Sequence, residues 1–353
     1  MAQNLKKYGL EEFCKNKNDK YENTNIGRVI SQAEGIYKVV TNETEMLAVI
    51  TGRMRYKTQN ITDYPAVGDF VVLDRNNDEK GNARILKILP RKSQFVRMSS
   101  GTSNQSQIIA ANIDYVFICM SLNSDFNLKR LERYITISWN SGATLVVVLT
   151  KADLCTDIDS VLFAVESVAL GVDVLLTSSK DEDGLEEIHD FLKLGMTIAL
   201  IGSSGVGKST IINCLLGEKA AITKLIRNDD KGRHTTTQRE LYLLPNGSIL
   251  IDTPGMREIG LTSDTDDLSQ SFEDVEQYFG QCRFSDCTHH SEPGCAIFRA
   301  IENGELSEKR WNSYNQLKRE NELVKDKVGY IQKKNMFFKE IAKEKRNSKR
   351  VVY

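Results

Sequence analysis

The sequence predicts a chain of three parts: an all-β barrel near the N-terminus, a central α/β domain and a C-terminal helical module with clustered cysteines. Residues 26–89 contain five short β-rich runs separated by glycines and Asn/Asp clusters, the pattern of a small barrel. Residues 114–251 contain continuous apolar runs separated by segments of helical periodicity, which indicates a parallel sheet covered on both faces. Three of the seven cysteines lie between residues 282 and 295.

The totals favour a soluble, multidomain protein. The chain has 353 residues, of which 40% are hydrophobic and 27% charged, and its formal net charge of -1 gives no overall nucleic-acid signal. No apolar run approaches membrane length and the first ten residues lack a signal-peptide core, so we expect a cytoplasmic protein that does not bind membranes. The expected segments are an N-terminal extension (1–24), the barrel (25–97), a linker (98–108), the α/β domain (109–265) and the cysteine-containing module with its tail (266–353).

The barrel resembles an OB-fold, a barrel that often binds nucleic acid. Its strands are expected at residues 27–30, 36–40, 46–50, 70–73 and 85–89, after a short helix at 5–13. Cations beside an aromatic ring favour RNA binding at Arg53, Arg55, Tyr56 and Lys57. A second basic group, Arg91, Lys92 and Arg97, marks the exit from the barrel. The alternative is a barrel that only packs on its neighbour.

The α/β and C-terminal regions alternate strands with helices. Strands are expected at 114–120, 143–149, 172–176, 197–201, 240–244 and 248–251. Helices are expected at 128–139, 160–170, 184–194, 210–216, 295–301 and 310–325.

Residues 202–209 form a glycine-rich stretch between the apolar run 197–201 and a helix-like segment. The stretch fits G-x-x-x-x-G-K-[ST], in which backbone N–H groups enclose a polyphosphate at a helix N-terminus. Lys208 would reach the outer phosphates and Ser209 would bind Mg²⁺. The expected nucleotide contacts here are Gly202, Ser203, Ser204, Gly205, Val206, Gly207, Lys208, Ser209 and Thr210. The alternative, an ordinary Gly/Ser turn, does not explain all eight positions in this context.

Two further groups indicate which nucleotide binds. Asp252 and Gly255 belong to Asp-Thr-Pro-Gly at the end of an apolar strand, where a second Mg²⁺ contact and a γ-phosphate sensor are expected. Thr150, Lys151 and Asp153 fit the element that reads guanine, in which the carboxylate accepts both guanine N–H groups. Thr177, Ser178 and Ser179 fit the element that covers the base carbonyl. Thr150 stands where most such proteins have Asn, a residue whose hydrogen bond positions neighbouring loops, so the sequence leaves that hydrogen bond open.

The order of these motifs is unusual. Both base-reading elements precede the phosphate loop, whereas an ordinary small GTPase has them after it. The domain is therefore predicted to be a circularly permuted P-loop GTPase, which a doubly wound sheet tolerates when the original ends lie close together. The segment after Asp252 then leads directly into the C-terminal module, so nucleotide state is expected to act on that module.

With these motifs, the chain resembles the RsgA (YjeQ/YloQ) GTPases. The resemblance extends over about residues 27–299 and rests on Pro-Arg-Lys-Ser at 90–93, the permuted motif order, Gly-Arg-His-Thr-Thr-Thr at 232–237 and the cysteine cluster. It implies a monomeric GTPase that binds late precursors of the small ribosomal subunit and their rRNA. It also implies that the subunit stimulates hydrolysis of GTP, bound with Mg²⁺, to GDP and phosphate, and that the protein leaves on hydrolysis.

Cys282, Cys287, His289 and Cys295 supply three thiolates and one imidazole within 14 residues. This is the ligand set of a closed, tetrahedral structural Zn²⁺ site, so we expect one Zn²⁺ per chain. His290 is the competing imidazole, and the family pattern favours His289. A cluster of free thiols or a disulfide is the alternative, which a reducing compartment disfavours.

The usual catalytic glutamine is missing from this sequence. Met256 follows Asp-Thr-Pro-Gly where many GTPases have a water-orienting glutamine, and His234 is the nearest polar candidate by sequence. We expect His234 to act in catalysis with Lys208, and Thr236 to bind Mg²⁺. The alternative is that His234 packs or binds RNA.

The C-terminal tail is basic. Residues 331–353 carry eight Lys or Arg against two Glu, a net charge of +6, which favours contact with RNA phosphates over a merely solvated helix end. Two rival functions stay open: an RNA-binding module in which hydrolysis is incidental, and an ATP-dependent phosphotransferase, which would need no guanine-reading element.

Overall fold

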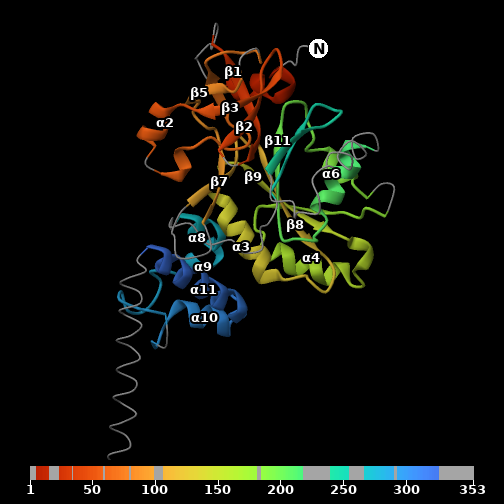
Figure 1. Cartoon of the computed structure of the whole chain (residues 1–353). Helices are drawn as coiled ribbons and strands as arrows, with labels where there is room; N and C mark the ends of the chain where they lie inside the picture. The colour runs from red at the N-terminus through yellow and green to blue at the C-terminus, as the bar shows by residue number, and fades with distance from the viewer. Residues whose placement is uncertain are drawn as a thin grey trace, which may run out of the picture. The chain divides into compact units, whose positions relative to one another are not determined.

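The computed structural model describes residues 5–15, 24–33, 35–58, 60–78, 81–98, 106–180, 184–217, 239–253, 266–289 and 292–325. The chain divides into two compact units, residues 1–260 and residues 261–353, which are described separately below (Figure 1). Among the described residues, none of the helices combines the length and hydropathy that crossing a membrane requires.

The N-terminal part of the first unit is a five-stranded barrel consistent with an OB-fold. Its strands are β1 (Ile26–Ala33), β2 (Ile36–Val40), β3 (Glu45–Ile50), β4 (Phe70–Leu73) and β5 (Ala83–Ile88). The strands pair in the order β1-β2-β3-β5-β4, and pairing of β4 with β1 closes the barrel. Alternate residues face inward, so side chains such as Val29, Val39 and Ile85 form a fully buried core.

A short helix that we did not expect, α2 (Gly52–Lys57), follows β3, and a 3-10 turn, η2 (Ile61–Asp63), precedes β4. The Thr51 side chain caps α2 by accepting a hydrogen bond from the Met54 N–H, 3.2 Å away. Met54 packs against the barrel core, and Tyr56 is 93% exposed. The run Arg53 to Tyr56 therefore forms a helix on the barrel surface and not the end of a strand.

The N-terminal extension packs against both the barrel and the α/β part. It contains η1 (Leu5–Tyr8) and α1 (Leu10–Cys14) in place of the single helix expected at 5–13. Gly9 separates them with a left-handed φ of 77°, and a Cβ there would lie 2.6 Å from the Gly195 carbonyl oxygen. The Phe13 ring packs on Phe70, with ring centroids 4.4 Å apart. Leu5 and Phe13, within the described residues 5–15 of the extension, are thus part of the core of the first unit.

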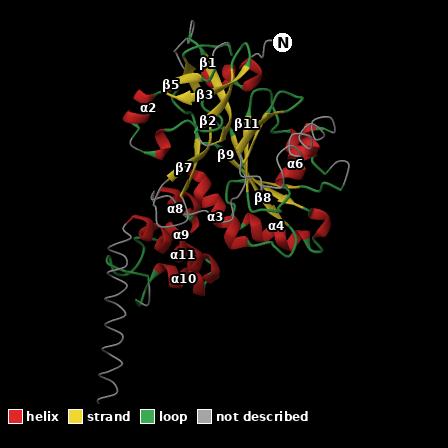
Figure 2. Cartoon of the chain, in the orientation of Figure 1, coloured by secondary structure: helices red, strands yellow, loops and turns green. Residues whose placement is uncertain are grey.

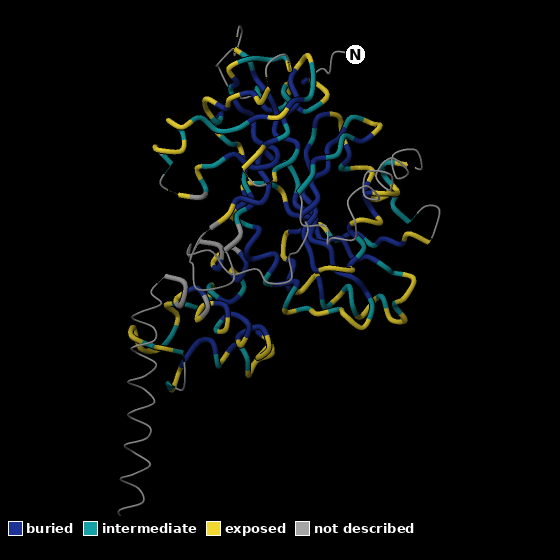
Figure 3. Tube along the Cα trace, in the orientation of Figure 1, coloured by how far each residue is buried: buried dark blue, intermediate teal, exposed yellow. Residues whose placement is uncertain are grey.

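The α/β part contains a six-stranded sheet in the order β10-β9-β8-β11-β13-β12. Its strands are β8 (Tyr115–Ser121), β9 (Thr144–Thr150), β10 (Asp173–Leu176), β11 (Thr197–Ile201), β12 (Arg239–Leu243) and β13 (Ile249–Asp252). All neighbours are parallel except β12, which runs antiparallel to β13. The strands confirm the predicted alternation of strands and helices. The sheet is mixed, however, and not entirely parallel, because β12 is antiparallel. The strands of this sheet are drawn mostly in dark blue in Figure 3, the colour of buried residues.

Helices lie beside the strands of the sheet (Figure 2). They are α3 (Leu128–Trp139), α4 (Ile158–Glu166), α5 (Glu186–His189) and α6 (Lys208–Leu216), with a 3-10 turn, η3 (Ala152–Leu154). Ile188 of α5 and Ile211 of α6 share a core with Phe117 of β8. The α3 helix matches its predicted range, whereas α5 has four residues in place of the eleven expected.

The barrel and the α/β sheet form one continuous sheet of 11 strands, because β12 pairs antiparallel with β1. Arg28 of β1 is 1% exposed at this junction, and burial lowers its guanidinium pKa to about 10. It donates hydrogen bonds to the Gly68 carbonyl oxygen, the Tyr8 carbonyl oxygen and the Thr197 hydroxyl. Arg28 thus connects the N-terminal extension, the barrel and the first residue of β11, the strand that leads to the phosphate loop.

A hairpin that we did not expect joins the barrel to β8. It consists of β6 (Gln94–Met98) and β7 (Ser106–Ala111), which pair antiparallel. The expected linker, 98–108, therefore begins in β6 and ends in β7. Residues 99–105 lie outside the described residues. Before the hairpin, Arg91 pairs with the buried Asp69 at 2.7 Å, and Lys92 pairs with Asp114 at 2.5 Å. These two cations connect segments of the first unit.

The second unit contains α8 (Asp266–Ser271), α9 (Glu273–Glu276), α10 (Ala296–Glu302) and α11 (Glu308–Lys325). Its core is aromatic: Phe279, Trp311 and Tyr314 pack together, with ring centroids 5.6 Å apart for Trp311 and Tyr314. Arg310 is buried over Phe272 and forms an ion pair with Asp274. The basic tail, 331–353, lies outside the described residues.

Candidate functional site

The phosphate loop connects β11 to α6, as the sequence predicts. Gly202 has a φ of 143°, and a Cβ there would lie 2.4 Å from the Cys119 carbonyl oxygen, so a side chain cannot be accommodated. Gly207, with a φ of 104°, precedes the first residue of α6, Lys208. Because the loop ends at this helix N-terminus, its backbone N–H groups are suited to bind an anion.

Lys208 is 8% exposed and lies against the loop that precedes it. Its ammonium donates hydrogen bonds to the carbonyl oxygens of Gly202, at 2.7 Å, and Ser203, at 2.8 Å. Burial lowers its pKa below the ordinary value, and the nearby Asp252 partly opposes this shift. Ser209 and Thr210 lie in the exposed first turn of α6, next to Lys208. The ammonium of Lys208 therefore lies against the loop to which the sequence pattern assigns phosphate binding.

The first base-reading element contacts the phosphate loop directly. The Thr150 hydroxyl donates a hydrogen bond to the Val206 carbonyl oxygen, and it lies 3.5 Å from the Met120 carbonyl oxygen. Lys151 adopts a left-handed φ of 58°, uncommon for a residue with a side chain, and its ammonium donates to the Gly205 carbonyl oxygen at 2.8 Å. Thr150 thus supplies a loop-positioning hydrogen bond although the usual Asn is absent.

The second base-reading element packs against the first. The Ser178 hydroxyl donates to the Asp153 carboxylate at 3.3 Å, and the Ala152 N–H donates to the Thr177 carbonyl oxygen at 3.1 Å. Lys180, which we did not predict, pairs with Asp153 at 2.7 Å. The hydrogen bond from Lys180 is the largest cause that holds the pKa of the Asp153 carboxyl below its ordinary value. Asp153 is therefore an ionised acceptor in this loop pair. The predicted Ser179 is exposed in the second loop.

Asp252 ends β13, beside β11, and is 8% exposed. In the parallel register Asp252 pairs with Leu200, so its carboxylate lies near the start of the phosphate loop. The next residue, Thr253, donates from its hydroxyl to the Leu200 carbonyl oxygen at 2.5 Å. Gly255, His234 and Thr236 lie outside the described residues, so their expected roles stay predictions.

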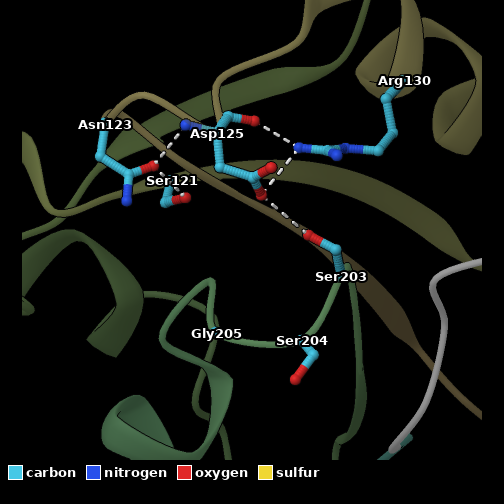
Figure 4. A pocket seen from close by; sticks show the side chains of 7 residues that line it. All are labelled: Ser121, Asn123, Asp125, Arg130, Ser203, Ser204 and Gly205. Carbon is cyan, nitrogen blue, oxygen red and sulfur yellow. Dashed lines mark hydrogen bonds and ion pairs between the residues drawn. The ribbon is translucent and has the colours of Figure 1, made fainter.

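A pocket of about 540 Å³ lies beside the phosphate loop (Figure 4). One wall is the loop itself, and the other walls come from the segment after β8 and the first turn of α3. The lining residues are Ser121, Asn123, Asp125, Arg130, Ser203, Ser204 and Gly205. The first four of these residues were not predicted from the sequence. No local motif marks them, although Ser121 ends the parallel strand β8 and Asn123 and Asp125 follow it, and the ends of such strands are the usual place for a ligand.

The predicted metal ligands of the second unit converge. The Nδ1 atom of His289 lies 3.4 Å from the sulfur of Cys282, 3.7 Å from that of Cys287 and 3.4 Å from that of Cys295. Tetrahedral zinc with ordinary bond lengths places sulfur and nitrogen ligands about 3.5 Å apart. His289 also stacks on Phe279, with ring centroids 4.9 Å apart. The four side chains are compatible with a zinc site, and the competing His290 lies outside the described residues.

Comparison with known proteins identifies the family. A family model described as RsgA GTPase matches residues 88–262. The chain is 48% identical over 321 residues to small ribosomal subunit biogenesis GTPase RsgA 2 of Lactiplantibacillus plantarum, covering 91% of this chain and 90% of the relative. It is 43% identical over 311 residues to RsgA 1 of Oceanobacillus iheyensis, covering 88% of this chain and 86% of the relative.

Two solved structures are similar along most of the chain. YjeQ from Thermotoga maritima matches with a TM-score of 0.59 and 26% identity, covering 83% of this chain and 96% of that one. YloQ, described as a circularly permuted GTPase, matches with a TM-score of 0.58 and 26% identity, covering 88% of this chain and 98% of that one. In the present chain, too, the base-reading elements precede the phosphate loop. The chain therefore belongs to the RsgA GTPase family.

Proposed function

We propose that the protein hydrolyses GTP to GDP and phosphate during late maturation of the small ribosomal subunit, and that the subunit stimulates this reaction. One observation carries the nucleotide assignment. Lys151 and Thr150 bond to the phosphate loop, while Asp153 lies two residues further on with Ser178 and Lys180. A guanine base read by Asp153 and phosphates held by Lys208 would thus belong to one ligand.

The proposed partner is the small ribosomal subunit with its rRNA. The relatives' names, small ribosomal subunit biogenesis GTPase, support this partner. On the barrel, α2 presents Arg53, Arg55 and Tyr56 to solvent, and such a combination of cations and an aromatic ring suits a single-stranded or looped RNA. Arg91 and Lys92 are held in internal ion pairs, so we assign the RNA contact to α2. The basic tail is a second proposed RNA contact.

We assign one structural Zn²⁺ to Cys282, Cys287, His289 and Cys295, and Mg²⁺ to the nucleotide site with Ser209 and Thr236 as ligands. The ligand spacing described above supports the zinc assignment. We further propose that the barrel is an OB-fold, that the α/β part is circularly permuted as in YloQ, and that the protein acts as a cytoplasmic monomer. Membership of a GTPase family supports GTP with Mg²⁺.

The decisive experiment measures GTP turnover by the purified protein with and without small ribosomal subunits, and with ATP as competitor. The proposal requires slow turnover alone, a burst of phosphate on adding subunits, and no competition by equimolar ATP. Subunit binding that depends on the nucleotide, without any phosphate burst, would instead support the RNA-binding module in which hydrolysis is incidental. Equal competition by ATP would support a phosphotransferase.

A further inference from the structure

The pocket beside the phosphate loop contains an arginine that the proposed mechanism does not use. Arg130 lies in the first turn of α3, where its backbone N–H is held by the Asn127 side chain at 2.9 Å. Its guanidinium projects toward the loop before the helix, as Figure 4 shows. Nη2 donates to the Asp125 carboxylate at 2.9 Å and to the Asp125 carbonyl oxygen. Arg130 thus belongs to the pocket wall opposite the phosphate loop.

Asp125 connects this arginine to the phosphate loop. The Oδ2 atom that accepts from Arg130 also accepts from the Ser203 hydroxyl at 3.4 Å. The carbonyl oxygen of Ser203 is in turn an acceptor for Lys208. Arg130 is therefore linked to the phosphate loop through Asp125, which contacts both the guanidinium and Ser203. A change of side-chain rotamer could bring the guanidinium of Arg130 to this loop.

The guanidinium is incompletely satisfied where it lies. Within the part of the chain that the structure describes, the Nε atom of Arg130 is buried without a hydrogen-bond partner. The side chains of Arg130 and Asp125 are 26% and 51% exposed, so solvent screens and weakens their ion pair. A phosphate, with more charge and several acceptor oxygens, competes well for such a guanidinium. Arg130 can therefore exchange Asp125 for a bound phosphate, which would be the stronger partner.

We propose that Arg130 is an arginine supplied in cis to the outermost phosphate of bound GTP, and that Asp125 holds it in a resting position. In phosphoryl transfer such an arginine neutralises charge that develops on the phosphate oxygens, and it stays protonated throughout. The inference rests on the proposed hydrolysis of GTP at this site. It adds a catalytic residue from α3 to those predicted from the sequence motifs.

The test compares the full-length variants Arg130→Ala and Asp125→Asn in single-turnover GTP hydrolysis without subunits. Arg130→Ala should lower the rate at least about 10-fold. This is less than the roughly 10³-fold or larger acceleration that such arginines commonly supply. The same change should also weaken binding of a non-hydrolysable GTP analogue more than binding of GDP. Asp125→Asn keeps an acceptor for Ser203 but removes the charge that holds Arg130, so it should raise the rate up to about 5-fold.

Opposite signs in the two variants distinguish this role from a structural one. If the ion pair only stabilises the phosphate loop, both variants lose activity, and that result would overturn the proposal. An unchanged rate in Arg130→Ala would also overturn it, whereas an unaltered protein that fails to hydrolyse GTP would refute the proposed function instead. Should Arg130→Ala fail to fold, Asp125→Asn decides: a higher rate supports the proposal and an equal or lower rate contradicts it. Lys129→Ala, which removes the neighbouring exposed cation, is the matched control.

Discussion

The phosphate loop and the cysteine loop are held in place by different means. The phosphate loop extends from a strand whose Ile198 and Leu200 are fully buried, and its own Val206 is fully buried as well. In the cysteine loop most residues from 281 to 288 are exposed, and of the four ligand side chains only Cys295 is buried. A hydrophobic core therefore fixes the geometry of the first loop, whereas the second has little core and is expected to depend on its metal.

The largest effect should come from removing zinc. Structural zinc contributes about 10 kcal/mol to the folding of small modules, so a strong chelator should unfold the cysteine loop with the helices around it and leave the first unit folded. Trp311 lies 6.1 Å from the His289 ring and Trp139 lies in α3 of the first unit. In the variant Trp139→Phe, Trp311 is the sole tryptophan, and its fluorescence should report the unfolding.

GTP binding by the chelated protein is the control, and it should be retained. A Trp311 signal that survives complete zinc removal would show that the aromatic cluster alone holds the loop. Elemental analysis of protein purified without chelator should find one zinc per chain.

The next largest effect should come from Lys208→Ala. The phosphate loop keeps its core in this variant, so the melting temperature of the first unit should change little, while hydrolysis should fall about 10³-fold, the upper scale for losing one group that stabilises developing charge. Stimulated turnover close to that of the unaltered protein would refute the site. Lys193→Ala, an exposed cation in the same unit, serves as the control.

His234→Ala tests whether catalysis depends on a residue outside the described part of the chain. We expect the subunit-stimulated rate to fall about 10²-fold, the usual scale for a lost acid–base or positioning group, with GTP affinity and subunit binding near normal. Stimulation that persists in full would mean that the ribosome or another residue positions the water.

Asp153→Asn should reduce the preference for GTP over ATP by about 10- to 100-fold, because hydrogen bonds to a charged acceptor contribute about 1.5–3 kcal/mol. The preference is measured by competition binding of the two nucleotides. Asp159→Asn removes an exposed carboxylate of α4 and should have no effect. Equal affinity of the unaltered protein for both nucleotides would contradict the guanine assignment.

The smallest effect is expected from Thr150→Val, which removes the hydroxyl that donates to the Val206 carbonyl oxygen. Loss of one neutral hydrogen bond should weaken GTP binding by about 1 kcal/mol, or roughly 5-fold. Thr150→Ser keeps the hydroxyl and should bind GTP like the unaltered protein in calorimetric titration. Weakening by Thr150→Ser without weakening by Thr150→Val would assign the effect to packing of the methyl group.

Local segments with strong patterns were predicted well. The five barrel strands and α3 lie where periodicity and turn residues indicated, because each is decided by neighbours in sequence. The predictions were wrong where tertiary contacts decide: one helix at 5–13 is broken at Gly9, and the helix expected at 184–194 is reduced to α5. The α2 helix and the β6–β7 hairpin were missed, since short elements carry little periodic signal.

The sequence by itself determined the glycine-rich loop between β11 and α6 and the four side chains that converge in the cysteine loop, because each lies in a contiguous segment whose spacing matches a known chemistry. Only the tertiary structure decided which distant residues meet them. Ser203 and Asp125 are 78 positions apart, Arg28 and Thr197 are 169 apart, and Lys180 reaches Asp153 from a separate loop. Such pairs depend on the order and register of the strands that bring them together, and a single sequence carries no local record of that order.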